Sequence, residues 1–129
     1  MTVIKMSPAI DSRKDLLDRV GNLDELKIFN NQVLIATYIR PEKTKGGIIM
    51  TQNTRDEDRY QSKVGLVLKF GRSAFVDDDK WSWDGTVKTH DWIVFRPSDG
   101  WNITINTVPC RILEDTSVRC RIEDPDKVW

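Results

Sequence analysis

The run "QVLIATYI", from Gln32 to Ile39, sets the fold class of this chain. Its side chains are mostly apolar and several are β-branched, which favours a strand over a helix. Arg40-Pro41 ends the run, and a long polar stretch follows. The residues before Gln32 follow a different pattern, so the run also marks the start of the main domain.

Further short segments after this run have the same strand character. They are Lys63–Gly71, His90–Pro97, Trp101–Asn106, Cys110–Asp115 and Val118–Glu123. The dipeptides Asp84-Gly85 and Asp99-Gly100 are typical of hairpin turns between such strands. Short strands at this spacing, with little helix, predict an all-β domain in the form of a small β-barrel or a sandwich.

The first thirty residues show helical rather than strand periodicity. The apolar positions that carry this spacing are Leu16, Leu17, Val20, Leu23 and Leu26. Gly21-Asn22 predicts that the helix stops after about two turns. We therefore expect residues 1–29 to form a partly helical extension that packs on the barrel or on a neighbouring subunit. The main domain would then span residues 30–122, and residues 123–129 would form a C-terminal tail.

The composition limits the classes of function that the chain can have. With 129 residues, the chain is expected to form one domain. The charges of its 20 basic and 20 acidic side chains cancel, so the net charge is zero. This argues against sequence-independent binding of nucleic acid. No stretch has the length of a signal-peptide core or of a membrane span. We therefore expect a cytoplasmic protein without nucleic-acid or membrane partners.

Few residues could support catalysis or metal binding. Cys110 and Cys120 are too few for a disulfide framework, and we expect both to be free structural thiols. The alternative is a metal site, but only His90 could join them and structural zinc takes four ligands. His90-Asp91 lacks a nucleophile in a recognisable context, and Asp77–Asp79 is expected to be a solvated turn rather than a calcium loop. The chain is therefore predicted to be no enzyme and to need no metal or cofactor.

One connection is too long for an ordinary loop. More than twenty residues separate Ile39 from Lys63, and only "GGIIMT" among them resembles structure. In this segment Gly46 and Gly47 precede the apolar tripeptide Ile48–Met50. A loop of this length in a compact domain is usually functional or disordered. The residues alone leave two hypotheses open, namely a buried strand and an apolar plug that docks into another protein.

The order of these features resembles the GroES-type co-chaperonins. In that family the first strand leads into a mobile loop with a Gly-Gly pair and an apolar tripeptide. Here Lys45–Thr51 match the loop motif, Lys63–Gly71 match the second strand and Asp91–Phe95 match the third. The resemblance covers roughly residues 31–122, and the loop is its most specific element.

The resemblance implies both a fold and a function. The fold would be a GroES-like small β-barrel with a mobile loop over about 41–62 and a roof hairpin over about 72–89. The function would be that of a co-chaperonin that assembles into a ring, a heptamer in the family, and caps a GroEL-like chaperonin to enclose folding substrates. The residues expected to bind the chaperonin are Gly46, Gly47, Ile48, Ile49 and Met50.

Departures from the family pattern open an alternative. Residues 1–29 and the tail "EDPDKVW" have no counterpart, and the roof region carries Trp81 and Trp83. These tryptophans lie two apart, so they share one face of a strand, where they pack within the hairpin or form roof contacts with a partner. Such a chain resembles a divergent, bacteriophage-encoded member of the family. The alternative function is that of a capsid decoration subunit, located in the virion and bound to the major capsid protein.

A nucleic-acid binder of the OB type is less well supported, because the basic residues are not interleaved with aromatic ones.

A ring requires contacts between copies of the chain. The first and last strands are expected to lie at exposed edges of the sheet, and such edges pair readily with neighbouring chains. The residues expected near that subunit interface are Val33, Leu34, Val118 and Ile122.

Overall fold

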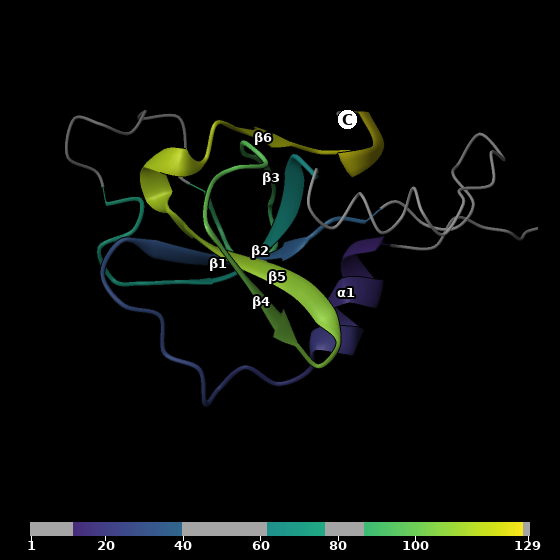
Figure 1. Ribbon diagram of the computed structural model, residues 1–129, viewed down its shortest axis with the longest axis horizontal. Coiled ribbons are helices and arrows are strands. Elements are labelled where there is room, and N and C mark those ends of the chain that lie inside the picture. Colours follow the sequence, from purple (N-terminus) through teal and green to yellow (C-terminus); the bar gives the residue numbers. More distant parts are fainter. Residues whose placement is uncertain (1–11, 40–61, 77–86, 128–129) are drawn as a thin grey trace, which may run out of the picture.

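The computed structural model describes residues 12–39, 62–76 and 87–127, which form one α-helix and a six-stranded antiparallel sheet (Figure 1). The elements are α1 (Ser12–Val20), β1 (Gln32–Thr37), β2 (Val64–Phe70), β3 (Trp92–Val94), β4 (Trp101–Ile105), β5 (Val108–Glu114), β6 (Cys120–Ile122) and two short 3-10 helices, η2 (Asp115–Ser117) and η3 (Pro125–Lys127). The strand order across the sheet is β4-β5-β1-β2-β3-β6. The all-β architecture expected from the sequence is confirmed.

Strand β1 lies in the interior of the sheet. It pairs with β5 on one side and with β2 on the other, both antiparallel. Four successive side chains, Val33 to Ala36, have no exposed surface. Because neighbouring side chains of a strand point to opposite faces, both faces of β1 are covered. This explains why the first strand reads as a continuous apolar run instead of an alternating one.

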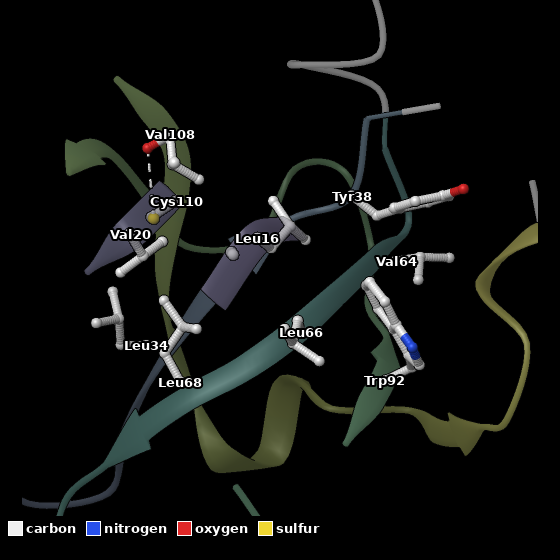
Figure 2. Packing of buried hydrophobic residues seen from close by; sticks show 11 residues of the cluster. Leu16, Val20, Leu34, Tyr38, Val64, Leu66, Leu68, Trp92, Val108 and Cys110 are labelled. Carbon is white, nitrogen blue, oxygen red and sulfur yellow. Dashed lines mark hydrogen bonds between the residues drawn. The ribbon is translucent and has the colours of Figure 1, made fainter. Parts of the chain in front are cut away.

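Each face of the sheet carries its own hydrophobic core. The α1-side core contains Leu16, Val20, Leu34, Ala36, Tyr38, Val64, Leu66, Leu68, Trp92, Val108 and Cys110. The second core, on the opposite face, contains Val33, Ile35, Val67, Ala74, Phe75, Val87, Ile93, Phe95 and Leu113. Figure 2 shows Leu16 and Val20 of α1 lying over the sheet residues of the first core. The predicted packing of the N-terminal helix on the strands is therefore confirmed for these two side chains.

The helix ends where the sequence predicts. Gly21 adopts φ 77° and its N–H donates to the carbonyl oxygen of Leu17 at 3.1 Å, as expected of a glycine that closes a helix. Asn106, in the turn between β4 and β5, donates from Nδ2 to the carbonyl oxygen of Val20 at 2.6 Å. The last turn of α1 is thus capped by its own glycine and by a distant hairpin.

The segment after the helix is held by a lysine of the sheet. This segment contains a single turn, in which the N–H of Leu26 donates to the carbonyl oxygen of Leu23. The Lys69 Nζ of β2 donates to the carbonyl oxygens of both Leu23 and Leu26, each at 2.7 Å. These bonds fasten the chain between α1 and β1 to the sheet.

Of the two predicted hairpin turns, Asp84-Gly85 lies outside the described residues and Asp99-Gly100 is not a hairpin. Asp99-Gly100 connects β3 to β4, which are not neighbours in the sheet, so this turn does not form a hairpin. The tight hairpin joins β4 to β5 through Asn106 and Thr107, whose φ values are 48° and 69°. Positive φ at both central residues is the geometry of a primed turn. This turn was not predicted from the sequence, because threonine rarely adopts a positive φ.

A buried arginine holds the connection between β3 and β4. The Arg111 guanidinium is almost fully buried, and its Nη1 donates to the carbonyl oxygens of Pro97 and Asp99, the latter at 3.0 Å. Its central carbon lies 5.0 Å from the ring centroid of Phe95, a cation–π contact. Burial lowers the pKa of Arg111 and the nearby Asp99 opposes this shift. The connection is therefore fixed from inside the second core, which determines where β4 begins.

Within the described residues β4 and β6 are the outermost strands and are not paired with each other, so the sheet is not closed. One expectation about the edges of the sheet is wrong. The first strand is not an edge strand, because β5 returns along the chain and occupies the side of β1 that the prediction left free. The prediction that the last strand lies at an edge is correct.

Replacing Lys69 with alanine should destabilise the protein by about 1–3 kcal/mol, because hydrogen bonds from a charged donor to the Leu23 and Leu26 carbonyls are lost. Urea unfolding followed by fluorescence measures the effect. Lys63→Ala is the matched control, because Lys63 is exposed and its side chain should contribute less than about 0.5 kcal/mol. Equal stabilities of the two variants would contradict the role given to Lys69.

Candidate partner-binding site

The residues predicted to bind a chaperonin, Gly46 to Met50, lie outside the described part of the chain. The structure does describe where the 40–61 segment leaves and re-enters the fold. The N–H of Tyr38 donates to the carbonyl oxygen of Val64 at 2.9 Å, and the Ser62 hydroxyl donates to the carbonyl oxygen of Tyr38 at 2.8 Å. We call this arrangement of Tyr38, Ser62 and Val64 the stem. Ser62, which the prediction placed in the loop, is fully buried in the stem.

The stem forms because β1 and β2 approach each other closely. Thr37 of β1 lies opposite Gly65 of β2. A Cβ atom added to Gly65 would lie 2.4 Å from Cδ1 of Ile35 and 3.2 Å from the carbonyl oxygen of Ala36. Only glycine therefore fits at this position without displacing its neighbours. The "KVGLVL" pattern thus brings the two ends of the 40–61 segment together.

The Tyr38 side chain links the stem to other elements. Its ring contacts Trp92 edge-to-face, with ring centroids 5.3 Å apart and planes at 71° (Figure 2). Its hydroxyl donates to Asp126 Oδ1 in η3. Burial, followed by the Asp126 carboxylate, raises the pKa of Tyr38 well above its usual value. The hydroxyl is therefore protonated at neutral pH and acts as a donor.

The predicted roof contacts Trp81 and Trp83 also lie outside the described residues. On the N-terminal side of this segment, Phe75 adopts φ 58° and its N–H donates to Asp115 Oδ2 at 3.2 Å. The other carboxylate oxygen of Asp115 accepts a hydrogen bond from Asn31 Nδ2 at 3.1 Å. One buried carboxylate therefore joins the start of β1 to the segment that follows β2.

On the C-terminal side of the roof segment, Val87 is buried in the second core. His90 adopts φ 74°, and its N–H donates to the carbonyl oxygen of Val67 at 2.7 Å. His90 is thus a turn residue hydrogen-bonded to β2 through its backbone. The described residues on both sides of the 77–86 segment are therefore anchored to the fold.

The four residues predicted for the subunit interface differ in position. Val33 and Leu34 are fully buried on the two faces of β1, so their side chains face the interior of their own subunit and do not form an outer surface. Val118 is partly buried against the second core. Ile122 is partly buried on the edge strand β6. Of the four, Ile122 has the position that contact with a neighbouring chain requires.

Sequence reasoning missed the exposed aromatic residues. Phe29, just before β1, keeps 71% of its surface exposed, and Trp101, at the start of β4, keeps 77%. Val76 is also exposed. Phe29 follows the helical pattern and precedes two asparagines, and Trp101 follows the Asp99-Gly100 turn. An aromatic residue beside a turn signal was the available clue, and exposed apolar side chains mark candidate contact surfaces.

The cysteines are separate free thiols. Cys110 is buried in β5 and Cys120 is exposed on β6, and neither forms a disulfide. Burial raises the pKa of the Cys110 thiol to about 11, so this thiol is protonated at neutral pH. In the described ranges no three His, Cys, Asp or Glu side chains are grouped so that they could hold a metal ion. Nor does any helix in the same ranges have the length and apolar character to cross a membrane.

Comparison with known proteins identifies the family. The family model described as chaperonin 10 Kd subunit matches residues 25–122, from the single turn before β1 to the last residue of β6. No curated protein matches the chain. The matched region contains the whole sheet and the stem, whereas α1 and η3 lie outside it. Since the match covers most of its length, the chain belongs to the chaperonin 10 family, the GroES-type co-chaperonins.

Proposed function

We propose that this chain is a co-chaperonin subunit that caps a GroEL-like chaperonin ring through the apolar tripeptide Ile48–Met50. Membership of the chaperonin 10 family, which is the observation that carries the proposal, supports a co-chaperonin role in general. The choice of the tripeptide rests on its position between the two ends of the stem and on its apolar character in a polar segment. In this role the chain performs no chemistry of its own.

The order of the strands favours a plug over a buried central strand. β1 and β2, which flank the 40–61 segment in sequence, are paired with each other, and their other sides are occupied by β5 and β3. An added strand has no place among these four. Both cores are built from residues of the described chain. The tripeptide would therefore find its apolar contacts on another protein.

The energetics of such a plug match a cap that must be released. Each large apolar side chain removed from water contributes about 1.5–3 kcal/mol. Ordering a segment on binding costs roughly 2–5 kcal/mol, so a single tripeptide binds weakly. Several identical plugs on one ring make the later contacts intramolecular, and the combined affinity rises without any new contact.

A ring requires two different patches that fit each other, because head-to-tail contacts are the ones that close into rings. We propose that one patch is the β6 edge around Ile122, since its backbone edge lies at the border of the sheet. The complementary patch would contain Phe29 or Trp101, the two most exposed aromatic residues of the described chain. This replaces the interface that was expected at Val33 and Leu34.

The full-length chain should therefore sediment as a closed oligomer several times larger than its 15.0 kDa subunit. Ile122→Asp should shift it toward the monomer, because a charge at an apolar contact loses hydration without gaining a partner. Between Phe29→Asp and Trp101→Asp, the variant that also dissociates identifies the second patch. A wild-type monomer at micromolar concentration would refute the ring, and a trimer would favour the decoration-subunit alternative.

That alternative, a virion decoration protein, rests on the parts of the chain outside the family match. α1 and η3 are such parts, and a shell-binding function could reside in them. In infected cells the two functions differ in where the protein is found. A decoration subunit would purify with virions in stoichiometric amounts, whereas a co-chaperonin would be found in the cytoplasmic fraction.

Replacing Ile49 with aspartate tests the plug. The variant should unfold at the same temperature as the wild type, because the proposal places the apolar contacts of Ile49 on the partner and not in either core. It should lose binding to a chaperonin ring with nucleotide, because a cost of about 1–3 kcal/mol per subunit is multiplied around the ring. Differential scanning calorimetry and co-sedimentation measure the two properties.

Gln52→Asp is the matched control for this test, since it places the same charge in the same segment but at a polar position. It should retain binding. Val67→Asp, a substitution in the second core, shows how far such a charge lowers the melting temperature. If Ile49→Asp lowers it as strongly, Ile49 is a core residue and the plug hypothesis is wrong.

A further inference from the structure

Strand β6 is held in the sheet by few contacts of its own. It has three residues, Cys120–Ile122, and within the described residues it pairs with β3 alone. Cys120 and Arg121 are exposed, whereas Ile122 packs against the α1-side core. The ion pair between Arg121 Nη1 and Asp91 Oδ2, at 3.7 Å, joins two partly exposed side chains and contributes little. An edge strand with so few contacts is expected to open easily.

The five residues after β6 turn back onto the sheet, and we call them the strap (residues 123–127). Asp124 accepts the N–H of Asp126 through its Oδ1 at 3.0 Å and the N–H of Lys127 through its backbone oxygen at 3.1 Å. Pro125 between them is buried. The strap lies beyond residues 25–122, the region that matches the family. It therefore has a local structure of its own, which presents the Asp126 carboxylate.

The strap is tied to the end of a strand that is distant from β6 in the sheet. Asp126 accepts a hydrogen bond from the hydroxyl of Tyr38, which directly follows β1. In the strand order, β2 and β3 lie between β1 and β6. The Tyr38 ring contacts Trp92 of β3 edge-to-face (Figure 2), and Trp92 is the pairing partner of Ile122. The contacts thus form a closed path from β6 through the strap, Tyr38 and Trp92 back to β6.

We propose that the strap keeps β6 in place through the Tyr38–Asp126 hydrogen bond, and that the pairing of β6 with a neighbouring copy of the chain depends on this bond. Tyr38 and Asp126 are then positioning residues, and the contact surface itself is the β6 edge. The dependence of assembly on the strap rests on the proposed function, whereas the effect of the strap on β6 does not.

The expected size of the effect follows from the population of the open strand. Loss of a hydrogen bond to a carboxylate should favour the opening of β6 by about tenfold or more. Without the strap, a strand of three residues at the edge of the sheet is expected to be open most of the time. A neighbouring subunit can pair only with the closed strand, so the apparent affinity falls in proportion to the closed fraction.

The test compares Tyr38→Phe, Asp126→Ala and the double variant in the full-length chain. Tyr38→Phe keeps the ring that contacts Trp92 and removes the hydroxyl. Glu123→Ala is the matched control, because it removes an exposed carboxylate from the same strap. Asp126→Asn is a second control, since its amide oxygen can still accept the hydrogen bond.

Two measurements separate the two halves of the proposal. Amide hydrogen exchange of residues 119–122 reports on β6, where the N–H of Arg119 donates to the carbonyl oxygen of Val94 at 2.8 Å. The Gly71 amide, which donates to the carbonyl oxygen of Gln32 at 2.9 Å, is the internal reference at the opposite end of β1 from Tyr38. Exchange is measured at a concentration at which every variant sediments as a single subunit. Sedimentation over a concentration series then reports on assembly.

We expect Tyr38→Phe and Asp126→Ala to exchange residues 119–122 about tenfold faster relative to Gly71. The concentration at which half of the protein is assembled should rise about fivefold in both variants. The double variant should resemble the more affected single variant, because both substitutions remove the same hydrogen bond. Glu123→Ala should stay within about twofold of the wild type in both measurements. Asp126→Asn should lie closer to the wild type than to Asp126→Ala.

Unchanged exchange of residues 119–122 in Tyr38→Phe would overturn the strap. Equal acceleration in Glu123→Ala, or at Gly71, would overturn it as well, because charge or general destabilisation would then be the cause. Faster exchange with unchanged assembly would overturn the role of the strap between subunits. If the wild type is monomeric at micromolar concentration, the proposed ring falls together with the assembly half of this proposal. The exchange measurement then still decides whether the strap holds β6.

Discussion

The whole structure depends on the burial of β1 on both faces and its pairing on both sides. Four consecutive residues, Val33 to Ala36, are removed from water, and both hydrophobic cores form on this one strand. The side between β1 and β2 is closed by their pairing, and beyond it the Ser62 hydroxyl is hydrogen-bonded to the Tyr38 carbonyl oxygen. The side toward β5 is closed as well, which leaves β4 and β6 as the edges.

The sequence predicted those features that are local. Six strands and one helix were expected from periodicity, and each is present within a few residues of its predicted bounds. The stop at Gly21 was predictable because a glycine after a helical pattern closes the last turn. The Asn106-Thr107 hairpin was not predictable in the same way, because neither residue is glycine and the turn is stabilised by a contact of Asn106 with α1.

Features that depend on which strands become neighbours were beyond a pattern-based prediction. The first strand was expected at an edge, and the interface residues Val33 and Leu34 were chosen for that reason. Nothing in the local pattern shows that β5 returns to the side of β1. The same limit applies to Tyr38, whose hydroxyl is bound by Asp126, 88 positions further along the chain. The continuous apolar character of "QVLIATYI" was the one signal that both faces of the strand are covered.

The candidate site combines a motif with a scaffold. The motif, two glycines and an apolar tripeptide, was readable from the sequence because such a run is anomalous in a polar segment. The scaffold is the stem, and its geometry requires long-range contacts: Gly65 against Ile35, Ser62 against the Tyr38 carbonyl and Asp126 against the Tyr38 hydroxyl. Family membership supports a co-chaperonin role, and Asp126 of the C-terminal extension adds a contact to the stem from outside the matched residues.

The central claim is that the assembled chain caps a chaperonin ring. Electron microscopy of the wild-type protein mixed with a bacterial chaperonin and nucleotide tests it most directly. The account predicts a dome of this protein seated on the end of the chaperonin ring, present with nucleotide and absent without it. Chaperonin rings that remain uncapped, beside an intact and folded oligomer of this protein at micromolar concentration, would contradict the account.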